Sequence, residues 1–228
     1  MTRHFAALVK RGAACALVAL LASAASAGAQ VSGVAFGVGG YAVQPRLVLQ
    51  QGDLREILTG TWVGGAARTR LGMFALHASA AVGKLTASSS SPPTLARDGV
   101  EASAEVDLWL TEGFALTGGV RLRGFATSMG SQTWRIIRTG LRISAPLGSE
   151  RLRAYLSAGY LPSVRVSGQS SPKLAFDADV GLVAAPLSFP LEFMVGYRLE
   201  RFDFAAGPTD RAEEFAAAYA GVSLGRLW

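Results

Sequence analysis

The sequence predicts an all-β fold, a transmembrane antiparallel up-and-down barrel of about ten strands, from three observations. The chain of 228 residues is 50% hydrophobic but only 17% charged, with a mean hydropathy of +0.31, whereas soluble domains usually have about 25% charged residues. The longest apolar stretch, 13–27, is shorter than the roughly 18 residues that a membrane-spanning helix needs. From about residue 31 onward, apolar and polar residues alternate with a period of two, which is typical of strands. The apolar content excludes a disordered chain, and the single cysteine excludes a disulfide scaffold.

Residues 1–29 have the three parts of a secretory signal peptide. Three basic residues precede an apolar stretch at 13–22, and small residues at 27–29 form a cleavage site; cleavage after Ala27 is nearly as good as after Ala29. A retained anchor helix is the alternative, but the apolar stretch is too short for it. Cleavage after Ala29 removes Cys15 and lowers the formal net charge from +6 to +3. We therefore expect one exported domain over 30–228.

Several function classes are excluded by the residues that remain after cleavage. The remaining chain has no cysteine and one histidine, His77, so zinc sites built from cysteines and multi-histidine metal sites are absent. A nucleic-acid partner is not expected, because the basic residues do not form a clustered stripe interleaved with aromatic residues. We expect no cofactor and no metal.

The alternation is clearest in a predicted hairpin. Even-numbered positions in 100–110 are apolar, whereas Glu101, Glu105 and Asp107 lie between them. The pattern restarts at 114 after a short turn at 111–113. A turn centred on Glu112 would place Glu101 opposite Arg123, Ser103 opposite Arg121 and Glu105 opposite Gly119, and directly opposed side chains interact.

Similar runs extend over the rest of the chain and give a count of ten strands. Eight strands remain possible if the two glycine-rich N-terminal runs merge or if 46–56 is a loop. The expected strands are 32–44, 56–67, 71–84, 100–110, 114–128, 133–145, 151–163, 174–182, 191–200 and 219–228.

The connections are expected to alternate in length, as they do in membrane barrels with short turns at one end and longer loops at the other. Both termini then lie at the end with the short turns, as an even strand count requires. The short turns are expected near 67–70, 111–113, 146–150 and 186–190, and the longer loops near 86–98, 126–132, 163–173 and 204–213.

A soluble periplasmic barrel or sandwich that binds a small ligand is the rival interpretation, since its strands also alternate. Its apolar residues would face inward and its polar residues would face water. The low charge and the 27 glycines favour the membrane barrel, whose apolar residues face lipid. Aromatic residues such as Trp62, Trp134, Tyr41, Tyr160 and Tyr197 could then form interfacial girdles.

The last ten residues resemble the assembly signal of small outer-membrane β-barrel proteins of Gram-negative bacteria. Those chains end on an aromatic residue preceded by apolar residues at alternate positions, and Val222, Leu224 and Trp228 match this pattern, whereas Arg226 departs from it. The resemblance implies an outer-membrane location, lipid contact, and insertion by the barrel-assembly machinery with periplasmic chaperones. It implies no activity, and we expect a monomer.

The polar face of the strands would line the lumen, with seven acidic and six basic residues. Arginine and carboxylate groups held close together in a narrow barrel would neutralise one another, which predicts a plugged lumen and a structural, envelope or surface-interaction role. A narrow pore is the alternative, in which a wall of arginines faces an acidic wall and selects ions by sign. The lumen candidates are Glu101, Glu105, Asp107, Arg121, Arg123, Arg138, Arg142, Arg153, Asp177, Asp179, Glu192, Arg198 and Glu200.

An enzyme is not expected, because hydrolytic sites need a histidine that is oriented by a third group. His77 is followed by Ser79 on the same strand face, but the sequence implies no partner that would orient the histidine. We assign no catalytic residue.

Overall fold

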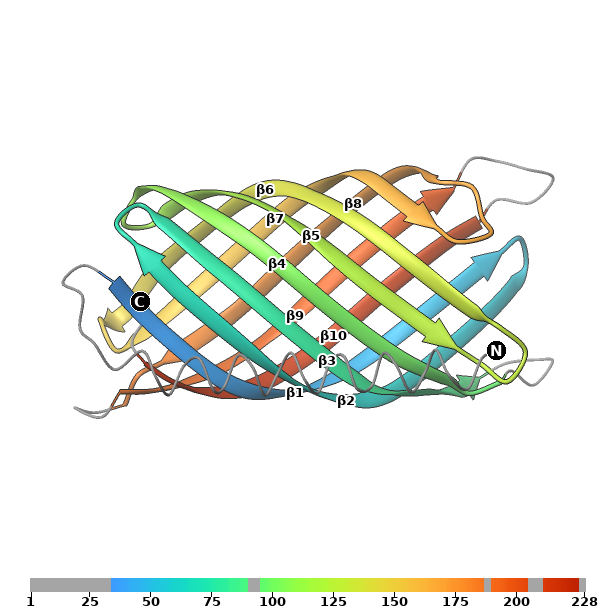
Figure 1. Ribbon diagram of the computed structural model, residues 1–228, viewed down its shortest axis with the longest axis horizontal. Helices are drawn as coiled ribbons and strands as arrows, with labels where there is room; N and C mark the ends of the chain where they lie inside the picture. Colours follow the sequence, from blue (N-terminus) through green and yellow to red (C-terminus); the bar gives the residue numbers. More distant parts are fainter. Residues whose placement is uncertain (1–33, 90–94, 187–189, 205–210, 226–228) are drawn as a thin grey trace.

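The computed structural model describes residues 34–89, 95–186, 190–204 and 211–225, and these form one closed antiparallel barrel (Figure 1). Each strand pairs with its neighbours in sequence, and the first strand pairs with the last to close the wall. In the described part of the chain, no helix is long and apolar enough to cross a membrane. The strands are β1 (Val34–Gln51), β2 (Leu54–Leu71), β3 (Phe74–Ser89), β4 (Arg97–Thr111), β5 (Phe114–Ala126), β6 (Ser131–Ser149), β7 (Leu152–Val166), β8 (Pro172–Ala184), β9 (Leu191–Phe204) and β10 (Arg211–Leu224).

The count of ten strands is confirmed, and the two N-terminal strands are longer than the sequence suggested. β1 continues to Gln51 and β2 begins at Leu54, so the possible loop at 46–56 is wrong. Pro45 lies inside β1, where it is opposite Ala217 of β10, while the pairing of β1 with β2 is interrupted between Val43 and Arg46. A proline lacks the N–H of a ladder hydrogen bond, which is why the sequence pattern fails here although the strand continues.

The connections follow the expected alternation only in part. Residues 52–53 join β1 to β2 by a two-residue turn at the end where the longer loops were expected. The turn expected at 67–70 lies at 72–73, where Gly72 has a φ of 57°, a left-handed conformation that glycine adopts without strain. We call the end of the barrel that holds Val34 and Leu224 the terminal end, and the opposite end the loop end.

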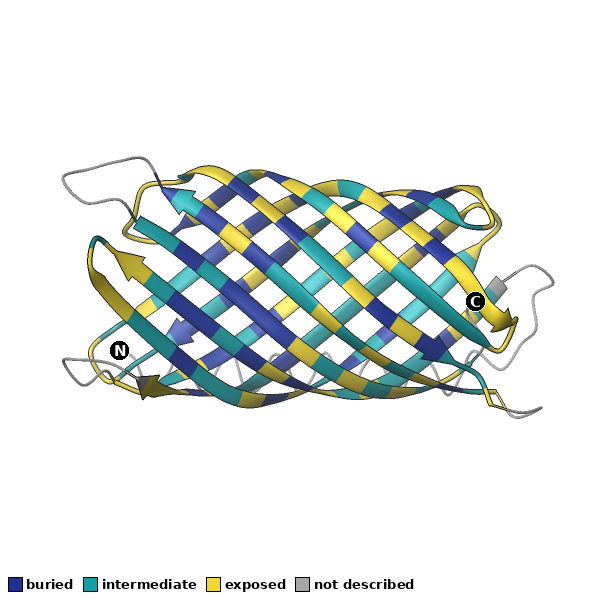
Figure 2. Cartoon of the chain, turned by 180° about the vertical axis from the view of Figure 1, so that it is seen from behind, coloured by how far each residue is buried: buried dark blue, intermediate teal, exposed yellow. Residues whose placement is uncertain are grey.

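The outer wall of the barrel is apolar, and Figure 2 shows the resulting alternation of burial along each strand. Large aliphatic side chains on separate strands are about half exposed, including Leu76 at 47%, Val120 at 51% and Val195 at 51%. A soluble barrel would bury these side chains. The outward apolar surface therefore argues against the soluble rival.

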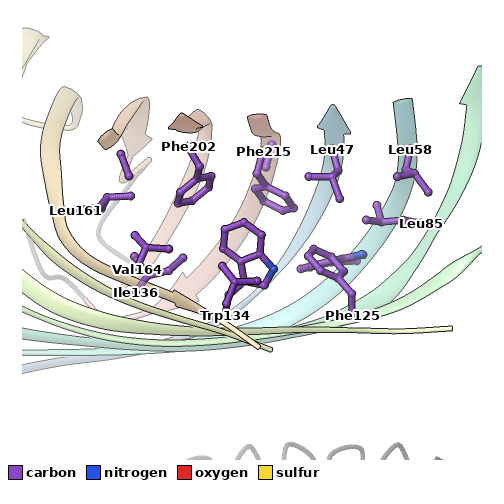
Figure 3. Close-up of a cluster of buried hydrophobic side chains, with 14 of the residues drawn as sticks. Leu47, Leu58, Leu85, Phe125, Trp134, Ile136, Leu161, Val164, Phe202 and Phe215 are labelled. Atoms are coloured by element: carbon purple, nitrogen blue, oxygen red, sulfur yellow. The ribbon is translucent and has the colours of Figure 1, made fainter. Parts of the chain in front are cut away.

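The lumen at the loop end is filled by a buried cluster of hydrophobic side chains, drawn in Figure 3, which we call the apolar plug. Trp62 packs against Phe215 with ring centroids 5.7 Å apart, and Trp134 packs against Phe202 at 4.9 Å. The plug is formed by Val43, Leu47, Leu58, Trp62, Ala81, Leu85, Phe125, Trp134, Ile136, Leu161, Val164, Val166, Ala175, Phe202, Phe204, Phe215 and Ala217.

The plug corrects the expectation of an aromatic girdle at two tryptophans. Trp62 and Trp134 are only 1% and 2% exposed, because they occupy inward positions of β2 and β6. Tyr41 packs against the same cluster. Tyr160 and Tyr197 are about half exposed on the outer wall, near the middle of β7 and β9.

Candidate functional site: a closed ionic layer in the lumen

Below the apolar plug, charged side chains from both sides of the lumen meet at Glu200. This carboxylate is fully buried on β9, and Arg121 and Arg123 reach it from β5. Arg121 forms an ion pair with Glu200, and Arg123 Nη2 lies 2.8 Å from Glu200 Oε2. Because three strands separate β5 from β9 around the wall, these contacts cross the lumen. Charges buried in this way are stable only when they are paired and hydrogen-bonded.

Glu101 on β4 makes the second set of contacts in this layer. It lies directly opposite Arg123, whose Nε donates to Glu101 Oε2 at 2.7 Å, so the predicted cross-strand pair is confirmed. Arg198 Nη2 donates to the other Glu101 oxygen at 2.7 Å from β9. The predicted opposition of Ser103 with Arg121 is also confirmed, as is that of Glu105 with Gly119. Glu101 thus joins neighbouring strands and the two sides of the lumen.

All three guanidinium nitrogens of Arg138 on β6 donate hydrogen bonds to side chains on strands β5, β7 and β8. Its Nε donates to Asp177 at 2.6 Å, its Nη1 to Thr117 at 2.5 Å and its Nη2 to Ser157 at 2.7 Å. The group has space because position 159 is glycine, where a Cβ would lie about 3.0 Å from Arg138 Nε. All four side chains are less than 9% exposed. A guanidinium fork with this many fixed partners is held in one orientation.

Towards the terminal end, His77 belongs to a series of hydrogen-bonded polar and charged side chains. Its Nε2 is 2.8 Å from Asp107 Oδ2, and Arg68 Nε donates to its Nδ1 at 2.5 Å. Asp107 also pairs with Arg142. In the neutral tautomer that carries its proton on Nε2, both ring nitrogens are hydrogen-bonded. Neither nitrogen is then available as a base, and Ser79 is bonded at 2.8 Å to Ser103.

Asp107 orients His77, although the sequence pattern alone did not identify it as the partner of the histidine. The residue directly opposite His77 is Glu105, and Asp107 lies diagonally from it. Arg68 was also missed, although its even-numbered position in β2 shares a face with Trp62. The histidine therefore has an acidic partner, but Arg68 occupies its second nitrogen.

The remaining candidates have different surroundings. Asp179 accepts a hydrogen bond from the Tyr219 hydroxyl at 2.6 Å, so its expected pairing with an arginine is replaced by a tyrosine contact. Arg153 lies outside the central network and contacts Ser144 at 3.3 Å and exposed Glu150 at 3.4 Å.

The last two candidates are Glu105 and Glu192. Glu105 receives contacts from Arg121 at 3.3 Å and Arg142 at 3.4 Å. Glu192 is buried and lines a cavity. All thirteen lumen candidates thus occupy inward positions of the strands.

Two of the three residues expected to form the assembly signal lie at the terminal end. Val222 and Leu224 are outward on β10, 43% and 53% exposed. Trp228 and the expected signal peptide, residues 1–29, lie outside the described residues.

The ionic layer and the apolar plug are in direct contact. The Arg123 guanidinium lies over the ring of Phe215, 3.7 Å from its centroid. Such a cation–π contact is favourable when both groups are desolvated. The two layers therefore form one continuous filling from the middle of the lumen to the loop end.

A cavity of about 220 Å³ lies beside the ionic layer, against β1, β2 and β10. It exists because the inward side chains there are small, including Gly39, Ala66 and Gly221. In the described ranges, no group of three or more histidine, cysteine or acidic residues could hold a metal ion.

Comparisons with known proteins place the fold. No model of a known family matches the chain, and no curated protein sequence matches it significantly. The outer-membrane protease OmpT from Escherichia coli is similar in structure, with 10% identity, a TM-score of 0.56 and coverage of 86% of this chain and 98% of that chain.

Weaker matches include the translocator domain of the autotransporter NalP from Neisseria meningitidis, with 15% identity, a TM-score of 0.48 and coverage of 97% and 100%. Another is Neisserial surface protein A, with 13% identity, a TM-score of 0.40 and coverage of 85% and 99%. The likeness to OmpT shows that this chain has the fold of an outer-membrane β-barrel, and no enzymatic function follows from it.

Proposed function

We propose that the chain is an integral outer-membrane β-barrel with a closed, charge-paired lumen, and that its role is structural or surface-interacting. The observation that carries this proposal is the contact of two fillings, the apolar plug and the ionic layer joined through Arg123 and Phe215. At their contact both groups are buried, with Arg123 2% and Phe215 1% exposed.

The outer wall supports insertion into a bilayer. About nine to eleven tilted residues cross a membrane, and β1 and β2 have 18 residues each, so they are long enough to cross and project beyond it. The terminal end would face the periplasm, where the signal peptide 1–29 has been removed. Insertion by the barrel-assembly machinery with periplasmic chaperones, as a monomer, belongs to the same proposal.

A narrow pore is the second candidate function, and the ion pairs argue against it. A pore that selects by charge needs arginines and acids that face each other across water. Here Arg121, Arg123 and Arg198 instead contact Glu101 and Glu200 directly. The field that would act on an ion is largely neutralised within the layer.

Membrane fractionation together with gel mobility tests the proposal. The full chain, expressed with its own signal, is expected in the outer-membrane fraction, and an unboiled detergent extract should migrate differently from a boiled one. Release from the periplasm without detergent, with no mobility change on boiling, would contradict it. That result would mean that the outward apolar surface does not contact lipid.

A further inference from the structure

On the outer wall, cations mark the loop-end margin of the apolar surface, and three of them have an acidic neighbour. Lys84 lies opposite Asp98 in the β3–β4 register. Arg46 on β1 is 3.8 Å from Glu214 on β10. Paired in this way, the charges largely satisfy one another.

Arg201 on β9 also has an acidic neighbour, because its Nε is 3.0 Å from Asp203 on the same strand. Its side chain is 49% exposed, so it faces the surroundings of the barrel while keeping its carboxylate partner. This residue is the natural comparison for any cation of the margin that lacks such a partner.

In the described part of the barrel, Arg135 on β6 and Arg165 on β7 have no such acidic neighbour. They are directly opposite each other, both are exposed, and both face outward because Trp134 and Val164 beside them face the lumen. Among the residues that the structure describes, neither has an ion pair or a side-chain hydrogen bond. Like charges directly opposite each other destabilise a sheet, so this arrangement has a cost that nothing in the described protein offsets.

The surroundings of this arginine pair fit one kind of anion. Exposed apolar side chains flank the pair: Leu122 lies directly opposite Arg135, and Ile137 lies two residues further along β6 towards the terminal end. An anion bound here would therefore be attached to hydrocarbon that lies along the barrel wall.

We propose that Arg135 and Arg165 bind the phosphate headgroup of a lipid whose acyl chains lie over Leu122 and Ile137. Planar guanidinium groups bind phosphate oxygens in pairs, and basic residues at a membrane surface attract anionic lipids. A bound phosphate would convert the repulsion between the arginines into a bridge between β6 and β7. The inference rests on the proposed membrane location, since it needs lipid around this end.

The test uses the refolded full chain and the variant R135Q/R165Q in nonionic detergent micelles, with R201Q as the matched control. Each protein is first checked for altered gel mobility on boiling. If the wild type shows no such change, the proposed membrane barrel fails. If it does, lipid binding is measured by native mass spectrometry with diphosphoryl lipid A, phosphatidylcholine or inorganic phosphate as probes.

For R135Q/R165Q we expect the affinity for diphosphoryl lipid A to fall about tenfold or more, equivalent to about 1.4 kcal/mol, and the affinity for phosphatidylcholine to stay unchanged. R201Q should bind as the wild type does. Equal binding by the wild type and R135Q/R165Q, or an equal loss in R201Q, would overturn the site. Inorganic phosphate binding as tightly as the lipid would overturn the assignment to a lipid.

Thermal unfolding gives a second test, because the difference in unfolding temperature between the wild type and a variant should reverse when the lipid is added. In nonionic detergent alone, the single variant R135Q should unfold at a higher temperature than the wild type, because the repulsion is removed. With diphosphoryl lipid A present, the wild type should unfold at the higher temperature. The same order in both conditions would contradict the proposed bridge.

Discussion

Arg123 of β5 and Glu200 of β9 lie face to face across the lumen, with Nη2 of the arginine 2.8 Å from Oε2 of the carboxylate. Since three strands separate them around the wall, this contact joins opposite sides of the barrel. The same arginine also contacts its cross-strand neighbour Glu101 and the ring of Phe215. One side chain thus connects the wall, the ionic layer and the apolar plug.

Replacement of the central carboxylate should destabilise the barrel strongly. Glu200→Gln removes the carboxylate that Arg121, Arg123 and Arg198 share and leaves an excess of buried positive charge, and breaking a buried pair in this way costs about 3–5 kcal/mol. Unfolding by denaturant, followed by tryptophan fluorescence in micelles, measures the change. The matched control is Glu150→Gln at the terminal end, whose side chain is 83% exposed and should cost about 0.5 kcal/mol or less. Similar stabilities of the two variants would mean that the ionic layer contributes little.

A methyl group at position 99 should disturb the apolar plug. A Cβ on Gly99 would meet the indole ring of Trp62, with one ring carbon about 3.0 Å away and others closer. Overpacking of this kind costs about 1–3 kcal/mol, so Gly99→Ala should unfold at a lower temperature than the wild type. The measurement is gel electrophoresis of samples heated to increasing temperatures, which gives the temperature at which the band of the folded form disappears. At Gly118 the nearest atom would be 3.9 Å away, and Gly118→Ala should be tolerated. If both variants lose the folded form at the same temperature, Trp62 is not tightly packed.

The geometry of Arg138, and not its charge alone, should matter. Arg138→Lys keeps the positive charge but cannot donate at once to Asp177, Thr117 and Ser157, so we expect a loss of about 1–3 kcal/mol from unsatisfied buried groups. Equilibrium unfolding in micelles measures this loss. Arg153→Lys is the control, because its contacts at 3.3 and 3.4 Å include exposed Glu150. An unchanged stability for Arg138→Lys would show that a point charge is sufficient.

The period-two pattern was sufficient to predict local pairing. Glu101 and Arg123 were expected to be opposite each other because a short turn fixes the register of a hairpin, and the structure confirms this pair. The same pattern correctly placed Leu122 on the outer wall. These features depend only on neighbouring strands.

Contacts across the lumen could not be predicted in the same way. Whether Arg123 meets Glu200 depends on the number of strands, their tilt and their stagger, and none of these is set by a local run of residues. The apolar plug was missed because Trp62 lies in a glycine- and threonine-containing strand where neither face is clearly apolar in sequence. Similarly, the continuation of β1 beyond Pro45 was not predicted, because proline is rare inside paired strands.

The central claim, a closed lumen, is tested most directly by conductance in a planar bilayer. Refolded protein that shows altered gel mobility on boiling should give no discrete conductance steps above those of the bare bilayer. Steady steps whose size changes when Arg138 or Arg142 is replaced by a neutral residue would contradict the account, because ions would then pass through the ionic layer.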